Sequence, residues 1–356
     1  MARQTSKKRT TKSAKALKRS SKSTKRQLND DIGEELRLKM WKLQLEIRHL
    51  EVRAHDLFFQ NLIKGTSHLA TGQEAIASAC AAVMRSDDYT FCTYRGLAHT
   101  LVRGASMEGV LGELMGRECG LLGGKGGSMH LTDVEKGAMG SYAIIGAHLP
   151  IAAGAAWKAQ YLKTGQVAFC FFGDGTTNIG AFHEALNFSV IWKLPVIFVC
   201  ENNLYMEYKP ISEVTAVEHP AADRAGAYGL ESIIVDGNDA DAVYRVAQKA
   251  VKKARNGDGP SLIEAKTYRH SGHSRADPAT YRPEGELEEW LEKDPIKIYR
   301  QRLLDFNVTE KVISEIETTV LKAVDNATEL AKKSPPPSEE VLMTEVWSDG
   351  GSSWRN

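Results

Sequence analysis

Two short polar motifs, each placed directly after an apolar run, constrain the fold of this chain more than any other feature of its sequence. A Gly-Asp-Gly motif at 173–175 follows the apolar run 167–172, and a Glu-Asn-Asn motif at 201–203 follows the apolar run 196–200. Residues 181–193 lie between them and carry apolar side chains at helical spacing. The pattern predicts a strand, a helix and a second strand, which form a right-handed crossover in a parallel sheet.

The two motifs together predict a site for a divalent metal and a phosphate at one edge of that sheet. A crossover of this size brings the carboxyl ends of both strands to the same edge, where parallel sheets bind their ligands. There Asp174 offers a carboxylate oxygen and Asn203 an amide oxygen, which are ligands that Mg²⁺ prefers. The glycines allow the backbone to approach a phosphate, and the following helix presents its N-terminus to the negative charge. Each motif alone is a common turn or loop, so the prediction depends on finding both at strand ends.

The composition separates a basic N-terminal segment from an ordinary globular remainder. Eleven of the 46 Lys and Arg residues lie in residues 1–29, which contain no acidic residue, so the rest of the chain is acidic overall. The segment is rich in Ser and Thr and nearly lacks large apolar residues, so we expect residues 1–30 to be a disordered basic tail. A nucleic-acid-binding arm, a docking arm for an acidic partner and a solvated extension are the open alternatives. An organelle-targeting role is disfavoured because the tail lacks an amphipathic apolar face.

The rest of the chain alternates strand and helix patterns, which predicts one α/β domain over 31–335 with a helical N-terminal addition. The glycine-rich residues 116–141 and the polar residues 268–285 are expected to be loops that contact a ligand or an interface. Residues 336–356 follow a proline-rich break and are expected to form a tail. Further predicted helices cover 36–64, 71–84, 106–114, 147–162, 239–255 and 294–333, and further predicted strands cover 233–235 and 262–267.

The sequence also indicates the compartment. It has no apolar run long enough to cross a bilayer and no signal-peptide pattern. The five cysteines are scattered and include no Cys-x-x-Cys pair, which argues against zinc or a disulfide framework and for a reducing environment. We therefore expect a cytoplasmic protein, with the mitochondrial matrix as the alternative.

Several further segments have the residue types that a diphosphate site requires. His68 lies just ahead of Gly-Gln-Glu at 72–74, and Tyr-Arg-Gly at 94–96 follows a short β-like run. Residues 124–130 read Gly-Lys-Gly-Gly-Ser-Met-His, and residues 268–274 read Tyr-Arg-His-Ser-Gly-His-Ser after a predicted strand. Arginine suits bidentate contact with a diphosphate, and histidine suits proton transfer near neutral pH.

Taken in order, these segments closely resemble the α subunit of the two-chain, thiamine diphosphate-dependent 2-oxo acid dehydrogenases. The likeness covers roughly residues 35–335, and the segment 124–130 favours the pyruvate and acetoin dehydrogenase branch over the branched-chain enzymes. The resemblance implies the thiamine diphosphate-binding α/β fold, a parallel sheet flanked by helices. It also implies decarboxylation of pyruvate, or cleavage of acetoin, with transfer of the acyl group to a lipoyl group.

The resemblance further implies two cofactors, Mg²⁺ and thiamine diphosphate, and a role for each site residue. Mg²⁺ would be held by Asp174, Asn203 and the backbone carbonyl of Tyr205. His273 would assist proton or acyl transfer near the reacting carbon, with His68 nearby. The diphosphate would contact Tyr94, Arg95, Arg269 and backbone groups around Gly175 and Thr176, and the aminopyrimidine ring would contact the backbone around Ala143 and Ile145. The implied cofactor-binding set is therefore Tyr94, Arg95, Ala143, Ile145, Gly173, Asp174, Gly175, Thr176, Asn203, Arg269 and His273.

Two segments depart from the pattern of the family. The family commonly has His-Gly-His-Ser, whereas this chain has Ser271 at the first of these positions and keeps His273. The family often has Gly-Asn-Gly-Ile-Val-Gly, whereas residues 140–146 read Gly-Ser-Tyr-Ala-Ile-Ile-Gly. Both departures concern the shape of the substrate pocket more than the cofactor site. The loop 124–130 is expected to pack against a partner subunit rather than to supply a catalytic lysine.

The resemblance also implies partners. In this family the glutamate beside the aminopyrimidine ring comes from a β subunit, and no second cofactor-binding domain fits into this chain. We therefore expect an α₂β₂ heterotetramer that also binds a lipoyl-bearing acyltransferase, with no membrane partner and with nucleic-acid binding disfavoured. The alternatives are a branched-chain or other specialised 2-oxo acid enzyme, and a non-catalytic scaffold that binds acidic partners through its basic tail.

Overall fold

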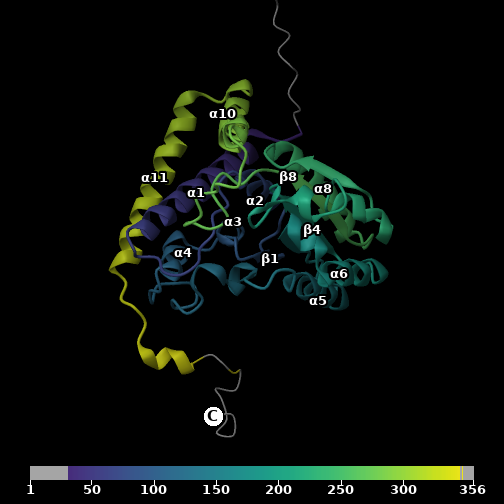
Figure 1. The fold of residues 1–356 in the computed structure, drawn as a ribbon, viewed down its shortest axis with the longest axis horizontal. Coiled ribbons are helices and arrows are strands. Elements are labelled where there is room, and N and C mark those ends of the chain that lie inside the picture. Colours follow the sequence, from purple (N-terminus) through teal and green to yellow (C-terminus); the bar gives the residue numbers. More distant parts are fainter. Residues whose placement is uncertain (1–30, 345–346, 348–356) are drawn as a thin grey trace, which may run out of the picture. The chain divides into compact units, whose positions relative to one another are not determined.

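The central element of the structure is a six-stranded parallel sheet with the strand order β2-β1-β3-β4-β8-β7 (Figure 1). The computed structural model describes residues 31–344 and residue 347, so the tail predicted over 1–30 and part of that predicted over 336–356 lie outside the described residues. The strands are β1 (Tyr89–Thr93), β2 (Ala138–Tyr142), β3 (Ala168–Gly173), β4 (Val196–Asn202), β7 (Ile233–Asp236) and β8 (Ser261–Lys266), and β5 (Tyr205–Met206) and β6 (Lys209–Pro210) form a separate antiparallel pair.

In the described residues, α-helices and short 3-10 helices precede, connect and follow these strands. No helix among them is both long enough and apolar enough to cross a bilayer. The 3-10 helices are η1 (Gly127–Met129), η2 (Val134–Lys136), η3 (Asp174–Asn178), η4 (Ala222–Tyr228) and η5 (Glu339–Met343). The α-helices are α1 (Glu34–Phe59), α2 (Glu74–Ala81), α3 (Leu97–Val102), α4 (Met107–Leu114), α5 (His148–Tyr161), α6 (Gly180–Ile191), α7 (Ile211–Val214), α8 (Ala240–Arg255), α9 (Glu286–Leu291), α10 (Pro295–Asp305) and α11 (Glu310–Lys333).

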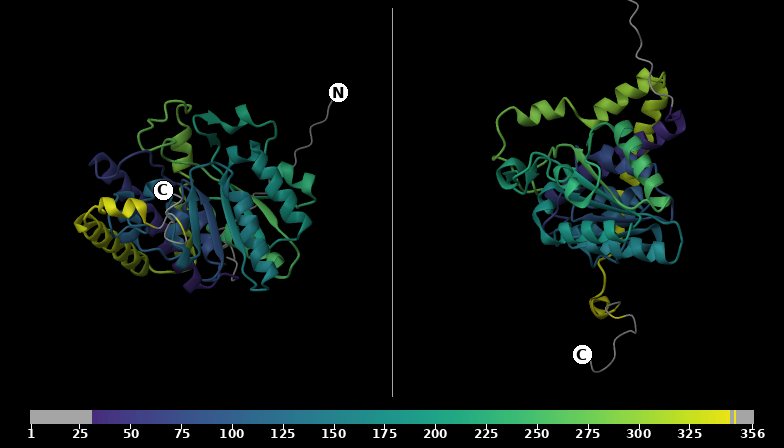
Figure 2. Two further views of the ribbon diagram at one scale, coloured as in Figure 1. Left: turned by 90° about the horizontal axis from the view of Figure 1, so that it is seen from below. Right: turned by 90° about the vertical axis from the view of Figure 1, so that its right-hand side faces the viewer.

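Alternate residues of the central strands face two different hydrophobic cores, because successive side chains of a strand point to opposite faces. Phe169 and Phe171 of β3 lie in the larger core with residues of α1, α2, α4 and α8. Cys170 and Phe172 of the same strand lie in the smaller core with residues of α5 and α6. Helices therefore cover both faces of the sheet (Figure 2). This two-sided burial explains why the strands appear in the sequence as uninterrupted apolar runs.

The crossover predicted from the two polar motifs is confirmed. β3 and β4 are parallel neighbours in register from Ala168 opposite Val196 to Gly173 opposite Glu201. α6 connects them, although it begins at Gly180, because residues 174–178 first form the 3-10 helix η3. The predicted α/β class, with a flanked parallel sheet and an N-terminal helix, is confirmed as well.

Some elements differ from the prediction. The helical stretch predicted over 294–333 is divided into α10 and α11, because Asn307 adopts a left-handed φ of 64° and the Thr309 side chain then accepts a hydrogen bond from Val312 N. The glycine-rich segment 116–141, expected to be a loop, contains the edge strand β2 as well as two 3-10 turns. The short helices α3 and α9 were not anticipated, since six-residue helices have too little periodicity to detect.

Candidate active site

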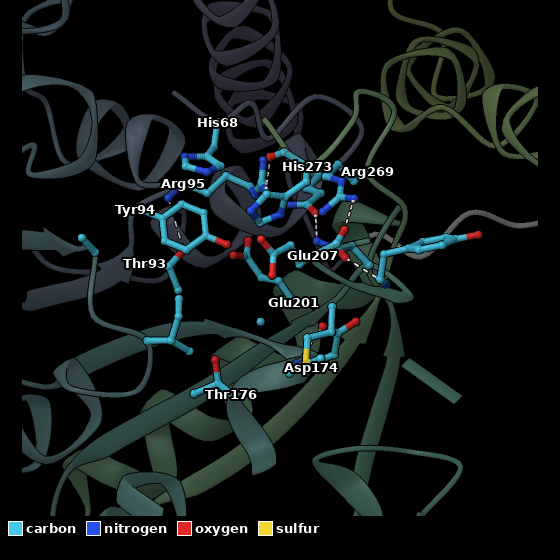
Figure 3. A pocket seen from close by; sticks show the side chains of 18 of the residues that line it. His68, Thr93, Tyr94, Arg95, Asp174, Thr176, Glu201, Glu207, Arg269 and His273 are labelled. Carbon is cyan, nitrogen blue, oxygen red and sulfur yellow. Dashed lines mark hydrogen bonds between the residues drawn. The ribbon is translucent and has the colours of Figure 1, made fainter. Parts of the chain in front are cut away.

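A cavity of about 550 Å³ lies where the carboxyl ends of the central strands meet the loops that follow them (Figure 3). Parallel sheets bind ligands at this edge because all strand ends and their loops converge there. Figure 3 shows His68, Tyr94, Arg95 and His273 on one side of the cavity and Asp174 and Thr176 on the other. All the residues predicted to contact cofactor or metal line it: His68, Tyr94, Arg95, Ala143, Ile145, Gly173, Asp174, Gly175, Thr176, Asn203, Tyr205, Arg269 and His273.

Asp174 is a buried carboxylate that lacks part of its hydrogen bonding. It directly follows β3 and is only 2 % exposed, and its Oδ1 accepts a hydrogen bond of 2.7 Å from Gly175 N. Its Oδ2 is buried and has no hydrogen-bond partner among the described residues. Burial disfavours the charged form and raises the pKa of this carboxyl to about 6. A cation at Oδ2 would supply the missing partner, so the residue fits a metal ligand.

Asn203 is held in one orientation by a neighbour from a distant segment. Its Nδ2 donates to Gln73 Oε1 at 2.9 Å, and its Oδ1 accepts a weaker bond of 3.3 Å from Tyr205 N. The loop that contains it includes two non-glycine residues with left-handed backbone, Leu204 at φ 72° and Glu207 at φ 54°. Each such residue costs about 1–2 kcal/mol, and strain of this kind is typical of ligand-binding loops.

The close packing beside Asp174 depends on Gly175, the second glycine of the Gly-Asp-Gly motif. A Cβ on Gly175 would lie 2.5 Å from Met206 Cγ, which is closer than two carbons can approach. The absence of a side chain therefore lets η3 and the loop after β4 meet at the cavity wall. Among the described residues no cluster of three or more His, Cys, Asp or Glu side chains could hold a metal. Any metal here would rely on mixed carboxylate, amide and carbonyl oxygens, a donor set that suits Mg²⁺.

Two buried arginines, Arg95 and Arg269, line the cavity together with the acidic residues Asp174, Glu201 and Glu207. Arg95 donates to the carbonyl oxygens of Leu69 and His273, and Arg269 donates to those of Ser271 and Glu207. Neither arginine forms an ion pair with a carboxylate within the described residues. Burial, followed by the charge of Arg95, lowers the pKa of Arg269 to about 10. Two guanidinium groups that are held by neutral oxygens and form no ion pair in the described part of the chain fit a polyanion such as a diphosphate.

Two histidines lie together beside a tyrosine. The ring centroids of His68 and His273 are 5.0 Å apart, and those of His68 and Tyr94 are 4.2 Å apart. Burial, with the nearby charge of Arg95, lowers the pKa of His68 to about 3 and that of His273 to about 4. Both imidazoles are therefore neutral at physiological pH, and the Nδ1 atom of each has no partner among the described residues. Neutral rings of this kind can accept a proton or hold a polar substrate group.

The loop 268–285 is fixed by hydrogen bonds around His273. Asp277 Oδ2 accepts from His273 N at 2.6 Å and from the Tyr281 hydroxyl at 2.8 Å. Arg282 donates to the backbone carbonyls of residues 269–271. Ser271, the departure from the family pattern, exchanges a hydrogen bond of 3.0 Å with Thr71 Oγ1 and does not line the cavity.

Several cavity residues were not identified from the sequence. Glu201 lines the cavity, and its Oε1 lies 3.1 Å from Nε2 of the buried His99. Its place at the end of β4, next to Asn202 and Asn203, could have indicated this position. Gln73 was noted only as part of a motif, and nothing in its local sequence indicates that it binds Asn203. The remaining missed residues are Thr93, Met129, Asn178, Ile179, Met206 and Glu207.

Comparisons with known proteins agree with this geometry. The model of the family described as dehydrogenase E1 component matches residues 43–340. The chain is 42% identical over 317 residues to the α subunit of acetoin:2,6-dichlorophenolindophenol oxidoreductase of Bacillus subtilis, covering 89% of this chain and 95% of that protein. It is 38% identical over 311 residues to the pyruvate dehydrogenase E1 component subunit alpha of Rickettsia felis, covering 87% and 95%. The acetoin enzyme α subunit of Cupriavidus necator is 36% identical over 318 residues, covering 89% and 95%.

Proposed function

The chain belongs to the dehydrogenase E1 component family, and we propose that it is the α subunit of a thiamine diphosphate-dependent enzyme that decarboxylates pyruvate or cleaves acetoin. The acyl group would pass to a lipoyl group on an acyltransferase. The observation that carries this proposal is the cavity in which a partly unpartnered buried carboxylate, Asp174, lies with two buried arginines that form no ion pair in the described residues. The named functions of the relatives, acetoin and pyruvate dehydrogenase α subunits at 36–42% identity, support the reaction class.

In this proposal, different residues of the cavity bind the metal, the diphosphate and the aminopyrimidine ring. Asp174 Oδ2, the Asn203 amide oxygen and the Tyr205 carbonyl would bind Mg²⁺. Arg95 and Arg269, with Tyr94 and backbone groups of residues 173–176, would bind the diphosphate. Backbone around Ala143 and Ile145 would contact the aminopyrimidine ring. Bound thiamine diphosphate supplies an electron sink for the bond that breaks beside the carbonyl carbon.

The two histidines act on the substrate side in the same proposal. The low pKa values keep both rings neutral. His273 would assist proton transfer at its ring nitrogen, and His68 would hold a polar group nearby. The Asp277 carboxylate accepts a hydrogen bond from the backbone N–H of His273, which fixes the main chain that carries the ring.

We further propose that the chain works with a β subunit in an α₂β₂ assembly. The relatives are named as α subunits, and Glu207 in the cavity wall is exposed, so the site reaches the surface of the chain. The lipoyl-bearing acyltransferase would bind that assembly. The domain limits 31–335 and the cytoplasmic location stay predictions.

The metal assignment can be tested with a control that the chain itself provides. Asp258 lies in a second Gly-Asp-Gly triplet at 257–259, is exposed and does not line the cavity. In the complex with its β partner, Asp174→Ala should weaken Mg²⁺-dependent binding of thiamine diphosphate at least about a hundredfold, because a direct ligand is lost. Asp258→Ala should bind as the wild type does. Titration calorimetry measures both affinities, and circular dichroism checks that the fold is retained. Unchanged affinity in Asp174→Ala would contradict the assignment.

Activity assays with different substrates distinguish acetoin and pyruvate from the branched-chain 2-oxo acids. The wild-type complex, supplied with Mg²⁺ and thiamine diphosphate, should reduce an artificial electron acceptor with acetoin or pyruvate. Branched-chain 2-oxo acids should be turned over more slowly. Turnover of branched-chain acids alone would contradict the proposed substrate but would leave the proposed cofactor unchanged.

A further inference from the structure

A fully buried glutamate outside the cavity accepts hydrogen bonds from four backbone amides of the glycine-rich loop at residues 122–127. Glu113 lies at the C-terminal end of α4 and is 0 % exposed. Its Oε2 accepts hydrogen bonds from Leu122 N at 2.7 Å and Gly124 N at 3.0 Å. Its Oε1 accepts bonds from Gly126 N at 2.6 Å and Gly127 N at 3.0 Å. A single carboxylate therefore organises four amides of one loop, and charge-assisted bonds of this type are stronger than neutral ones.

The glycine content of the loop follows from this arrangement. A Cβ on Gly120 would lie 2.5 Å from Glu113 Oε2, and Gly124 has a φ of 78° with the backbone of Arg117 only 2.8 Å from the position of a Cβ. Backbone amides that converge in this way form the concave sites in which proteins bind free anions. In this chain the bound anion is a side chain of the preceding helix.

The same loop reaches the cavity. Met129, two residues after Gly127, lines the cavity wall. Ser128 Oγ donates a hydrogen bond of 2.8 Å to the carbonyl of Thr66, two residues before His68, which also lines the cavity. The loop thus connects the buried carboxylate with the histidine side of the site.

We propose that Glu113 is a positioning residue for the reaction: its carboxylate fixes the loop 122–130 so that Met129 completes the cavity wall and Ser128 holds the segment that leads to His68. The kinetic part of this inference rests on the proposed function. The anchoring part rests only on the four hydrogen bonds.

Conservative substitutions of Glu113 can test whether its carboxylate fixes the loop. Glu113→Gln keeps the shape of the side chain, but one carboxylate oxygen becomes an NH₂ group that faces two N–H donors and cannot accept from them. Glu113→Asp keeps the charge but is one methylene shorter, so it reaches fewer of the amides. Glu118→Gln makes the same chemical change at an exposed position five residues later and serves as the matched control.

In the complex with the β partner, hydrogen exchange of the amides of Leu122, Gly124, Gly126 and Gly127 should be at least about tenfold faster in Glu113→Gln than in the wild type. The same variant should lower kcat/KM about tenfold or more. Its affinity for Mg²⁺ and thiamine diphosphate should stay within about threefold of the wild type, because the side-chain hydrogen bonds of Asp174 and Asn203 go to residues outside this loop. Glu113→Asp should give intermediate values, and Glu118→Gln should match the wild type in all three measurements.

A double-mutant cycle separates positioning from general loss of packing. Met129→Ala should lower kcat/KM without faster amide exchange, and adding Glu113→Gln to it should cost less than Glu113→Gln costs alone. Full additivity, or normal kcat/KM with fast amide exchange, would overturn the positioning role. Normal amide exchange in Glu113→Gln would overturn the claim that Glu113 fixes the loop.

If Glu113→Gln does not fold, Ser128→Ala provides a second test, because it removes the hydrogen bond between the loop and Thr66. This variant should also lower kcat/KM, and an unchanged kcat/KM would overturn the proposal. A wild-type complex inactive on every substrate would instead overturn the proposed function, while the exchange data would still test the anchor.

Discussion

At the scale of single residues, the candidate site consists of polar side chains that the fold buries without a full set of partners. Asp174 keeps one carboxylate oxygen without a hydrogen bond in the described residues, and Arg95 and Arg269 are held only by neutral groups. Each of these arrangements costs folding free energy, because burial disfavours an uncompensated charge. A bound cation and a bound polyanion would remove that cost, so cofactor binding should stabilise the fold by mass action.

A buried histidine outside the site should make stability depend on pH. His148 is fully buried, its Nε2 bonds to the Phe171 carbonyl, and burial lowers its pKa to about 4 from an ordinary 6.5. The unfolded chain therefore binds the proton between these two values, so stability is present above pH 6.5 and is lost as the pH falls towards 4. His148→Gln should reduce the loss of unfolding free energy between pH 7 and pH 5 by about 2 kcal/mol, measured by urea denaturation.

The exposed His130 supplies the control for that experiment. His130→Gln should keep the pH dependence of the wild type, because an exposed side chain has a similar environment in the folded and unfolded chain. An identical pH dependence in wild type and His148→Gln would contradict the role of His148.

At the scale of elements, boundaries are decided by single backbone conformations as much as by periodicity. α10 and α11 lie within one helical stretch of the sequence, yet Asn307 turns the chain between them with a left-handed φ of 64°. Thr309 then begins α11 by accepting a hydrogen bond from Val312 N. Asparagine tolerates this conformation better than other residues with a side chain, which explains its place at the break.

A substitution at that break tests the element directly. Asn307 is exposed, so Asn307→Ala changes mainly the backbone preference and should lower the free energy of unfolding by about 0.5–1 kcal/mol. Asn307→Gly should be neutral or stabilising. Asn256 is an exposed asparagine at the end of α8 with an ordinary φ of −75°, so Asn256→Ala should have a smaller effect. Thermal or urea unfolding measures all three, and equal effects of the two alanine variants would contradict this explanation.

At the scale of the whole molecule, a group of exposed aromatic and aliphatic side chains suits a subunit interface. Trp157 of α5 contacts Trp192, which follows α6, with ring centroids 5.9 Å apart, and the two side chains are 46% and 50% exposed. Tyr161 and Ile191 add further exposed apolar surface on the same two helices. Exposed aromatic clusters of this kind are typical of protein interfaces rather than of solvated surface. This α5–α6 surface is therefore where we expect the proposed β subunit to bind.

Charge substitution tests that surface. Trp192→Glu should weaken association with the β subunit about tenfold or more, because a charge would be buried without a partner. Leu330 of α11 is similarly exposed at 51%, so Leu330→Glu should leave association unchanged. Sedimentation or light scattering of mixtures measures the assembly, and thermal unfolding of each chain checks the fold. Normal assembly of Trp192→Glu would place the β subunit elsewhere.

The class of the fold and the location of the site were both predictable from local patterns. The apolar runs that became β3 and β4 and the motifs at 173–175 and 201–203 belong to single short segments. Because a parallel crossover brings consecutive strand ends together, these segments alone indicated where Asp174 and Asn203 would meet. The extent of β2 and the presence of α3 and α9 were not predictable, since glycine-rich or very short segments carry little periodicity.

The sequence by itself indicated which residues carry the polar chemistry of the candidate site. Asp174 and Asn203 follow recognisable strands, and the arginines and histidines lie in segments that resemble the family. Only the tertiary structure decided what holds them. Gln73 fixes Asn203 across 130 residues, His99 meets Glu201 across 102, and Glu113 is surrounded by the amides of a loop. Hydrogen bonds between distant segments have no spacing rule in the sequence, because they depend on how the packed helices and strands bring those segments together.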